Sequence, residues 1–242
     1  MLNASSLFKA SLGAGSFFKV PPTESRLPAG PGQQPVLVPI RSIGPGERDR
    51  IARHLLDLDL HDRYLRFGYA ASDEQVQRYV DALDFDRDEI FGIYNRRLEI
   101  IALAHLAFPP AGQPMDCAEF GGSVSKHARR RGYGARLFER TIVTARNEGI
   151  GMIFIHALSE NAAMIKIARN AGATVVRSGS EAEAHLQLPK ADFDSRMTEI
   201  ALDNFGEVDF QLKTRAKRFW TFLHAMQEIR RGGRPPSDHA AS

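Results

Sequence analysis

The chain has 242 residues, of which 43% are hydrophobic and 25% charged, and its formal net charge at pH 7 is only +3. This length is enough to bury the core of one domain of about 150 residues with appended segments. The single cysteine, Cys117, excludes an intrachain disulfide, and the best apolar run, residues 100–108, is too short to cross a bilayer. We therefore expect a protein of a reducing compartment, the cytoplasm, without a membrane partner.

Residues 1–23 contain several serines and no acid, as an organelle transit peptide does, but they lack arginine. The N-terminal segment, residues 1–35, ends in a stretch rich in Pro and Gly. It is predicted to be a disordered tail and linker. A folded domain over residues 36–190 follows. Its first half is predicted to contain alternating strands and helices, with strands at 36–43, 89–95 and 98–108 and helices at 46–58 and 73–83.

Two segments between or next to these elements contain charged residues whose role the pattern of strands and helices does not explain. DRYLRF, residues 62–67, reads as a short element packed on the sheet, and its Arg66 is expected either to form an ion pair or to line a binding site. The acidic run from Asp84 to Glu89 lacks the spacing and the glycine of a calcium-binding loop. No metal site is predicted.

The most informative stretch is VSKHARRRGYGA, residues 124–135, which follows a strand expected at 118–124 and opens an amphipathic helix that stops near Gly149. Gly132 and Gly134 permit positive φ and close main-chain approach. The free N–H groups at the start of the helix, with its dipole, favour an anion. The stretch therefore predicts a backbone pyrophosphate site whose candidate ligand-binding residues are Arg129, Arg130, Arg131, Gly132, Tyr133, Gly134 and Ala135.

Other glycine-loop classes do not fit this stretch. The chain contains no Gly-x-x-x-x-Gly-Lys-Ser/Thr string, which excludes a Walker A loop. A dinucleotide fingerprint needs an acidic residue about 20 positions on, but no acid follows until Glu160. A plain surface turn with solvated arginines remains the alternative.

A second block, GMIFIHALSENAAMIKIARNAGA, runs from Gly151 to Ala173 and reads as a strand, an asparagine (Asn161), and a helix that ends at Gly172. Two further strands are expected at 173–178 and 182–188.

Beyond the domain, residues 191–231 are predicted to form a helical extension and 232–242 a disordered tail. An apolar stripe must be covered by this domain or by a second copy of the chain, and consists of Leu212, Ala216, Phe219, Leu223 and Met226. Basic residues lie off the stripe, at Lys213, Arg215, Lys217 and Arg218. They are expected to be a solvated face rather than a nucleic-acid surface.

The two blocks, in this order and spacing, resemble the GNAT superfamily of acetyl-CoA-dependent N-acetyltransferases. Arg129, Gly132 and Gly134 match its Gln/Arg-x-x-Gly-x-Gly/Ala signature, and Asn161 with Gly172 match its second one. DRYLRF and the strand AEFGGSV (118–124) further resemble the acetyltransferase domain of bacterial protein lysine acetyltransferases. Over residues 36–190 the resemblance implies a mixed α/β (α+β) fold, with a mostly antiparallel sheet splayed between its fourth and fifth strands and flanked by helices.

The resemblance also implies acetyl-CoA as co-substrate and a primary amine, of a small molecule or a protein lysine, as acceptor. Main-chain groups of Val124 and its neighbours Ser123 and Ser125 would pair with the pantetheine arm and face the thioester. Asn161 would hydrogen-bond that arm or the neighbouring backbone.

Two residues are candidates for the base that deprotonates the acceptor. Glu119 stands where the lysine acetyltransferases place their catalytic glutamate, and His156 stands where ribosomal-protein N-terminal acetyltransferases carry theirs. Where many relatives have a tyrosine that protonates the departing thiolate, this chain has Ala168. Tyr133 or a water could replace it, or no acid is needed.

Three classes of function remain. An N-acetyltransferase is favoured, a non-catalytic acyl-CoA sensor or interaction module of the same fold is the alternative, and a nucleic-acid binder is the weakest, because the glycine turn and the C-terminal helix account for the basic residues.

Overall fold

The computed structural model describes residues 38–110, 112, 116–190, 196–199, 201–211, 213, 214 and 217. Both predicted tails and the residues of the predicted apolar stripe lie outside this part of the chain. By its internal contacts the chain divides into two units, and everything below concerns the unit made of residues 38–109 and 114–242.

A seven-stranded sheet forms the centre of this unit, in the order β1-β2-β3-β4-β5-β7-β6. All neighbours are antiparallel except β4 and β5, which are parallel. The strands are β1 (Arg41–Ser42), β2 (Glu89–Tyr94), β3 (Ile100–Ala107), β4 (Cys117–Val124), β5 (Met152–Leu158), β6 (Thr174–Ser178) and β7 (Glu181–Gln187). This confirms the mixed, mostly antiparallel sheet expected from the sequence.

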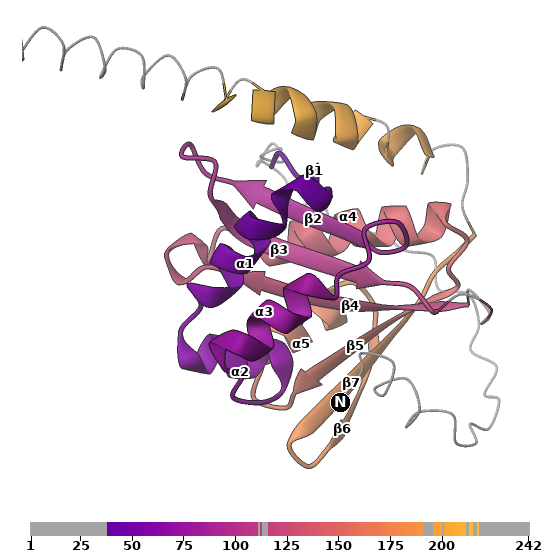
Figure 1. The fold of residues 1–242 in the computed structure, drawn as a ribbon. Helices are drawn as coiled ribbons and strands as arrows, with labels where there is room; N and C mark the ends of the chain where they lie inside the picture. Colours follow the sequence, from indigo (N-terminus) through magenta and orange to yellow (C-terminus); the bar gives the residue numbers. More distant parts are fainter. Residues whose placement is uncertain are drawn as a thin grey trace, which may run out of the picture. The chain divides into compact units, whose positions relative to one another are not determined.

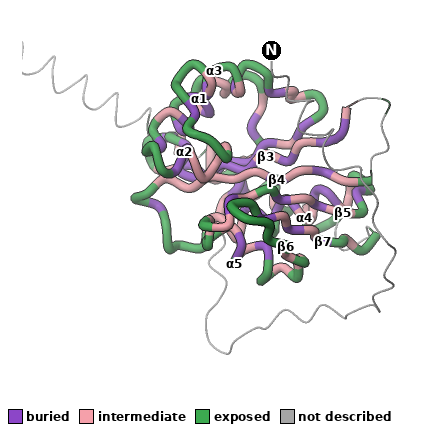
Figure 2. Tube along the Cα trace, turned by 90° about the horizontal axis from the view of Figure 1, so that it is seen from below, coloured by how far each residue is buried: buried purple, intermediate pink, exposed green. Residues whose placement is uncertain are grey.

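Helices cover both faces of the sheet, with α1, α2 and α3 on one face and α4 and α5 on the other (Figures 1 and 2). Their bounds are α1 (Arg48–Leu56), α2 (Leu60–Phe67), α3 (Asp73–Asp81), α4 (Tyr133–Asn147) and α5 (Ala162–Asn170), with short 3-10 turns at η2 (Pro45–Glu47) and η3 (Lys126–Ala128). Each face has its own apolar cluster, one with Phe91, Phe120 and Phe138, the other with Ile51, Leu55 and Val76. The expected DRYLRF element is α2.

The first strand is shorter than the residue pattern predicts. Among residues 38–43, the described part of the expected strand 36–43, only Arg41 and Ser42 are in a strand, and the amide of Ile43 extends the pairing by donating to the carbonyl of Ile90 at 2.8 Å. Pro39 has no amide hydrogen, so it cannot contribute a ladder bond on the N-terminal side.

The expected splay lies between β4 and β5. Their pairing ends at the residue pair Glu119 and Phe154, so that Phe120–Val124 has no partner strand on that side (Figure 1). The two strands separate there, although each continues for several residues.

Residues 196–199 and 201–211 are helical and lie against α4 and β1. The guanidinium of Arg140, which is 3% exposed, contacts Glu199 at 3.3 Å and Asp203 at 2.5 Å. Arg41 joins Glu207 at 2.7 Å. A buried cation of this kind needs its carboxylates, because an unpaired charge in the interior is strongly destabilising.

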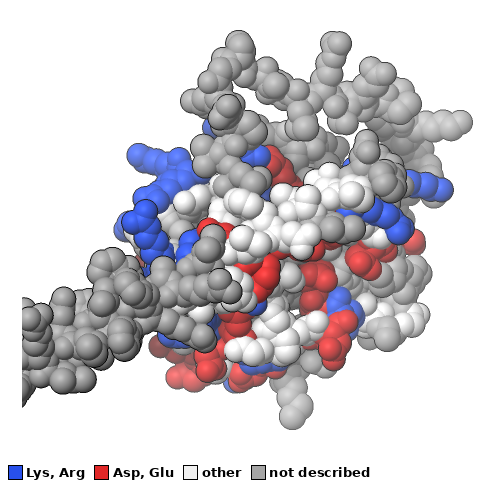
Figure 3. Space-filling view, turned by 90° about the horizontal axis from the view of Figure 1, so that it is seen from above, with Lys and Arg blue, Asp and Glu red and all other residues white. Residues whose placement is uncertain are grey.

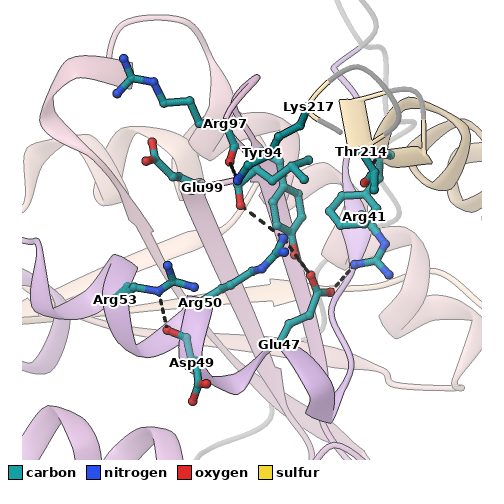
Figure 4. A network of polar contacts seen from close by, with 12 residues as sticks. Arg41, Glu47, Asp49, Arg50, Arg53, Tyr94, Arg97, Glu99, Thr214 and Lys217 are labelled. Carbon is teal, nitrogen blue, oxygen red and sulfur yellow. Dashed lines mark hydrogen bonds and ion pairs between the residues drawn. The ribbon is translucent and has the colours of Figure 1, made fainter. Parts of the chain in front are cut away.

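A second polar network connects residues of the C-terminal extension to the edge of the sheet (Figure 4). Glu47 accepts from Tyr94 Oη at 3.2 Å and pairs with both Arg41 and Arg50. Lys217 donates to the carbonyl of Arg97 at 2.9 Å. The C-terminal extension is therefore tied to the domain by charged groups at several points.

The face seen in Figure 3 carries acidic side chains among the basic ones, so the positive charge of this face is not gathered into one patch. Within the described part of the chain, no helix has the length and apolar character needed to cross a bilayer.

A buried histidine connects α1 to β3 and β4. His54 is 3% exposed, its Nδ1 lies 3.0 Å from the carbonyl of Ile100 and its Nε2 lies 2.8 Å from Ser123 Oγ. Because a carbonyl can only accept, Nδ1 carries the hydrogen and Nε2 accepts from the serine hydroxyl. Burial lowers the pKa of His54 to about 4, helped by the nearby charges of Arg66 and His127.

This pKa predicts an acid-sensitive fold. An unfolded histidine titrates near 6.5, so the neutral folded form contributes stability above that pH and loses it as the pH falls toward 4. Between these pH values the free energy of unfolding should fall by about 3 kcal/mol more than it does in His54→Gln, whose side chain cannot be protonated. Chemical denaturation at a series of pH values measures this free energy. If it depends on pH equally in the wild type and in His54→Gln between pH 6.5 and 4, the assignment is contradicted.

Candidate functional site

The unpaired edge of β4, residues Phe120–Val124, presents backbone groups away from β3. The amide of Ser125 donates to the carbonyl of Ile101 at 2.9 Å, which places Ser125 in register with β3. In an antiparallel pair such residues alternate, so the amides and carbonyls of Gly122 and Val124 point to the side that β5 has left. Main-chain groups along this edge can pair with an extended, amide-bearing ligand.

The serines predicted beside this edge have other roles. Ser123 directs its side chain to His54, and the backbone amide of Ser125 is used by β3. Of the three predicted positions, Val124 alone turns its main-chain groups to the unpaired side, and its carbonyl accepts from Arg129 Nε at 3.3 Å.

At one end of this edge the chain enters the glycine turn. Arg130 and Gly132 both have positive φ, 62° and 77°, and Gly132 is the N-cap of α4. No side chain caps this helix, so the amides of Tyr133, Gly134 and Ala135 lack a partner within it. Three free donors and the positive end of a 15-residue helix form an anion site.

The two glycines are needed for different reasons. At Gly132 the backbone is in the left-handed region, which strains any other residue. A Cβ at Gly134 would lie 3.0 Å from Ile167 Cδ1 of α5, so this position allows α4 and α5 to approach closely.

The three arginines of the turn differ in their surroundings. Arg129 forms an ion pair with Asp62 of α2, which is 9% exposed. Arg130 and Arg131 are exposed and make no ion pair with other described residues. These two are available to an anionic ligand, whereas Arg129 already joins the turn to α2.

Glu119 lies at the other end of the unpaired edge. It is the last residue of β4 that pairs with β5, and it is half-buried. Because side chains alternate along a strand and Ala118 and Phe120 belong to the α4 side, Glu119 points to the face that carries α1, α2 and α3.

His156 lies on β5 on the same face, two residues beyond the partner of Glu119. Its side chain is 50% exposed and its Nδ1 is 3.8 Å from Glu183 of β7. The structure thus brings both candidate bases to the same face, on neighbouring strands, with Glu119 nearer the point where the strands part.

Asn161 is the N-cap of α5, where its Oδ1 accepts from the amide of Met164 at 3.1 Å. Its Nδ2 donates to the carbonyl of Leu65 in α2 at 3.5 Å. Asn161 was expected to hydrogen-bond either the pantetheine arm or neighbouring backbone, and in the structure its side chain bonds to backbone groups. Ala168 is fully buried in the apolar cluster, and Tyr133 packs partly against that cluster.

A polar chain that sequence reasoning missed runs from α2 to Asp88, the residue immediately before β2. Arg66 Nη2 donates to Tyr79 Oη at 2.7 Å, Tyr79 Oη lies 2.8 Å from His105 Nδ1, and His105 Nε2 lies 3.0 Å from Asp88 Oδ2. In the sequence only Arg66 was expected to form an ion pair or line a binding site, and Asp88 was noted only as part of the acidic run from Asp84 to Glu89. Tyr79, His105 and Asp88 lie on separate elements, and no spacing in the chain links them.

The direction of these hydrogen bonds follows from Asp88. Burial would raise its pKa, but hydrogen bonds from His105, Arg87 and the amide of Phe108 hold the pKa of Asp88 below its usual value. A carboxylate only accepts, so His105 donates from Nε2 and accepts from the Tyr79 hydroxyl. Among the described residues, no group of three or more metal-binding side chains gathers.

The fold and the motifs can now be compared with known proteins. The GNAT domain of PAT from S. lividans is 24% identical and has a TM-score of 0.53, covering 63% of this chain and 95% of that one. The Salmonella typhimurium protein yncA with its cofactor acetyl-CoA is 17% identical with a TM-score of 0.50, covering 64% and 96%. A GNAT-family acetyltransferase from Streptococcus pneumoniae is 12% identical with a TM-score of 0.50, covering 62% and 98%.

At these identities the solved structures show that the fold is shared. No curated protein sequence matches the chain at a significant level. The model of the acetyltransferase (GNAT) family matches residues 54–173, which include the glycine turn, Glu119 and Asn161. Residues 54–173 of this chain are therefore a domain of the acetyltransferase (GNAT) family.

Proposed function

We propose that this protein is an acetyl-CoA-dependent N-acetyltransferase that acetylates a primary amine, and that Glu119 is its proton acceptor. The observation that carries this proposal is the unpaired edge of β4, which has an uncapped helix N-terminus at one end and a carboxylate at the other. Among the compared structures, yncA is a protein of the same fold with acetyl-CoA as its cofactor.

The site has the donors that acetyl-CoA needs. The amides of Tyr133, Gly134 and Ala135, with Arg130 and Arg131, suit the pyrophosphate. The outward amide and carbonyl of Val124 suit the amide-bearing pantetheine arm, and the outward amide of Gly122 suits the thioester oxygen, on which negative charge develops during attack.

Glu119 would take one proton from the acceptor ammonium, directly or through a water, because only the neutral amine can attack. The nitrogen then bonds to the carbonyl carbon, the C–S bond breaks, and the second proton passes from the nitrogen to water as the amide forms. The electron pair of the broken bond stays on sulfur as the CoA thiolate. Holding both reactants along one strand edge lowers the entropic cost of the step.

Ala168 is the observation that favours a second candidate, a non-catalytic acyl-CoA sensor. At this position α5 offers no hydroxyl to protonate the thiolate, since Ala168 is buried among apolar residues. A thiolate is a good leaving group, which is why we favour the enzyme. Release of free thiol from acetyl-CoA in the presence of a panel of amines separates the two, because a sensor binds the cofactor without releasing thiol.

The acceptor is proposed as a class, a primary amine of a small molecule or of a protein lysine. The S. lividans neighbour is the domain of a PAT protein, which keeps protein lysine among the candidates. From its single cysteine we propose that the protein works in the cytoplasm.

The pyrophosphate site predicts a loss of CoA affinity for Gly132→Val and Gly134→Val. The first strains a residue at φ +77° and the second pushes α4 from Ile167, so each displaces the free amides. Calorimetry should show binding weaker by about 1 to 3 kcal/mol, the loss of one or two charged hydrogen bonds.

Gly179→Val is the matched control. Gly179 also has positive φ, +60°, with no atom near its missing Cβ, but it lies in the turn between β6 and β7. This variant should lose stability and keep its CoA affinity. Unchanged affinity in both turn variants would rule out the proposed site.

The proposed base predicts that Glu119→Gln lowers turnover about 10²-fold or more, the usual effect of losing a general base, with CoA affinity nearly unchanged. Rate should partly return at high pH, where the free amine is already present. Rates at several pH values, with an acceptor that the wild type acetylates, measure this.

His156→Gln is the comparison variant, because His156 lies on the same face but is half-exposed. His156→Gln should lower turnover much less than Glu119→Gln does. The roles are reversed if only His156→Gln loses activity, and full activity in both variants would mean that positioning alone accounts for the rate.

A further inference from the structure

Arg66 lies flat on β4 beside the proposed reaction site. A Cβ at Gly121 would be 2.9 Å from Arg66 Cζ and Nη2 and 3.0 Å from Nη1, so only a glycine leaves room for the guanidinium there. The rings of Phe67 and Tyr79 lie 5.2 Å from Cζ. These contacts hold the charge against the strand edge rather than in solvent.

Within the described part of the chain, no carboxylate neutralises this cation directly. Among the described residues Arg66 forms no ion pair within 4.0 Å, and its one hydrogen bond goes to Tyr79 Oη, at 2.7 Å. Its Nε is buried and has no acceptor. A buried donor without a partner costs free energy, and such a group in a folded protein calls for an explanation.

The chain Arg66, Tyr79, His105, Asp88 explains how the guanidinium stays in place without a direct countercharge. Each group donates to the next, and the chain ends on a carboxylate whose remaining oxygen is bonded to the amide of Phe108 at 3.2 Å. The chain uses only Nη2 of Arg66, which leaves as donors Nη1 and the buried, unpartnered Nε.

Those free donors lie near Glu119. Gly121, under the guanidinium, is two residues from Glu119 on the same face of β4, a separation of about 7 Å along a strand. A molecule with its amine at Glu119 would therefore have room for an acidic group at Arg66. The planar fork of an arginine matches a carboxylate better than any other side chain does.

We propose that Arg66 binds a carboxylate of the acceptor, so that the substrates of this site are amines with an acidic group near the amine. The inference rests on the proposed acetyl transfer. The same chemistry has two sources, a small amino acid or a protein lysine with an acidic neighbour, and the experiment below distinguishes them.

The first measurement compares kcat/KM for paired acceptors that differ only in charge. One arm uses ω-amino acids of increasing length against their amides, and the other uses lysine peptides flanked by Glu against the same peptides flanked by Gln. In the wild type the acid of at least one pair should be preferred about tenfold or more, the effect of a charged hydrogen bond, and Arg66→Met should abolish the preference. The arm that shows the preference identifies the source.

The second measurement does not depend on catalysis. Calorimetry on the CoA-saturated protein compares N-acetylated ω-amino acids, and N-acetyl-lysine peptides flanked by Glu, with their uncharged counterparts. The acid should bind about tenfold more tightly to the wild type and equally to Arg66→Met. If no amine releases thiol but this difference is present, acetyl transfer fails and the anion site stands. If transfer occurs without a preference for the acid in either measurement, the anion site is wrong.

Two further variants test the orientation of Arg66 and control for general surface charge. Tyr79→Phe keeps the ring but removes the hydrogen bond that orients Arg66, and should reduce the preference without abolishing it. Arg78→Met removes an exposed cation next to Tyr79 in α3 and should leave the preference for the acid unchanged. Equal loss in Arg78→Met and Arg66→Met would mean that general surface charge, and not this site, selects the acceptor, and would overturn the proposal.

Discussion

The structure depends on the point at which β4 and β5 stop pairing. Up to Glu119 and Phe154 the two strands form a parallel ladder, and beyond that pair β4 keeps only its bonds to β3. Strand groups left without a partner are costly unless something else satisfies them. The same break that interrupts the sheet thus creates a row of directed donors and acceptors, and it places a carboxylate at the row's closed end and a glycine turn at its open end.

Helix α2 connects the parts of the site to one another. Its Asp62 pairs with Arg129 of the turn, its Leu65 carbonyl accepts from Asn161 at the start of α5, and its Arg66 lies on β4 at Gly121. The helix also contacts β5. A change at any of these three contacts is therefore felt at the others, because one short helix makes them all.

The two faces of the sheet differ in chemistry. Toward α4 and α5 the cluster around Phe120 and Phe138 is apolar, which gives the glycine turn a rigid support. Toward α1, α2 and α3 the apolar cluster is interrupted by His54 and by the chain from Arg66 to Asp88. Buried polar groups are tolerated when each has a partner, and here nearly every one has. Arg66 Nε and Arg140 Nε are the exceptions in the described part of the chain.

The sequence by itself determined the local features. Glycine at positions 132 and 134, the capping asparagine and the apolar periods specify a turn, two helices and most strands, because each depends on neighbours a few residues away. It also singled out Glu119 and Arg66, though not their surroundings. Only the tertiary structure decided that β4 and β5 part at Glu119, that Ser123 bonds to His54, and that Tyr79, His105 and Asp88 form one chain with Arg66. These residues come from different elements, and the hydrogen bonds between them exist only once the helices pack on the sheet.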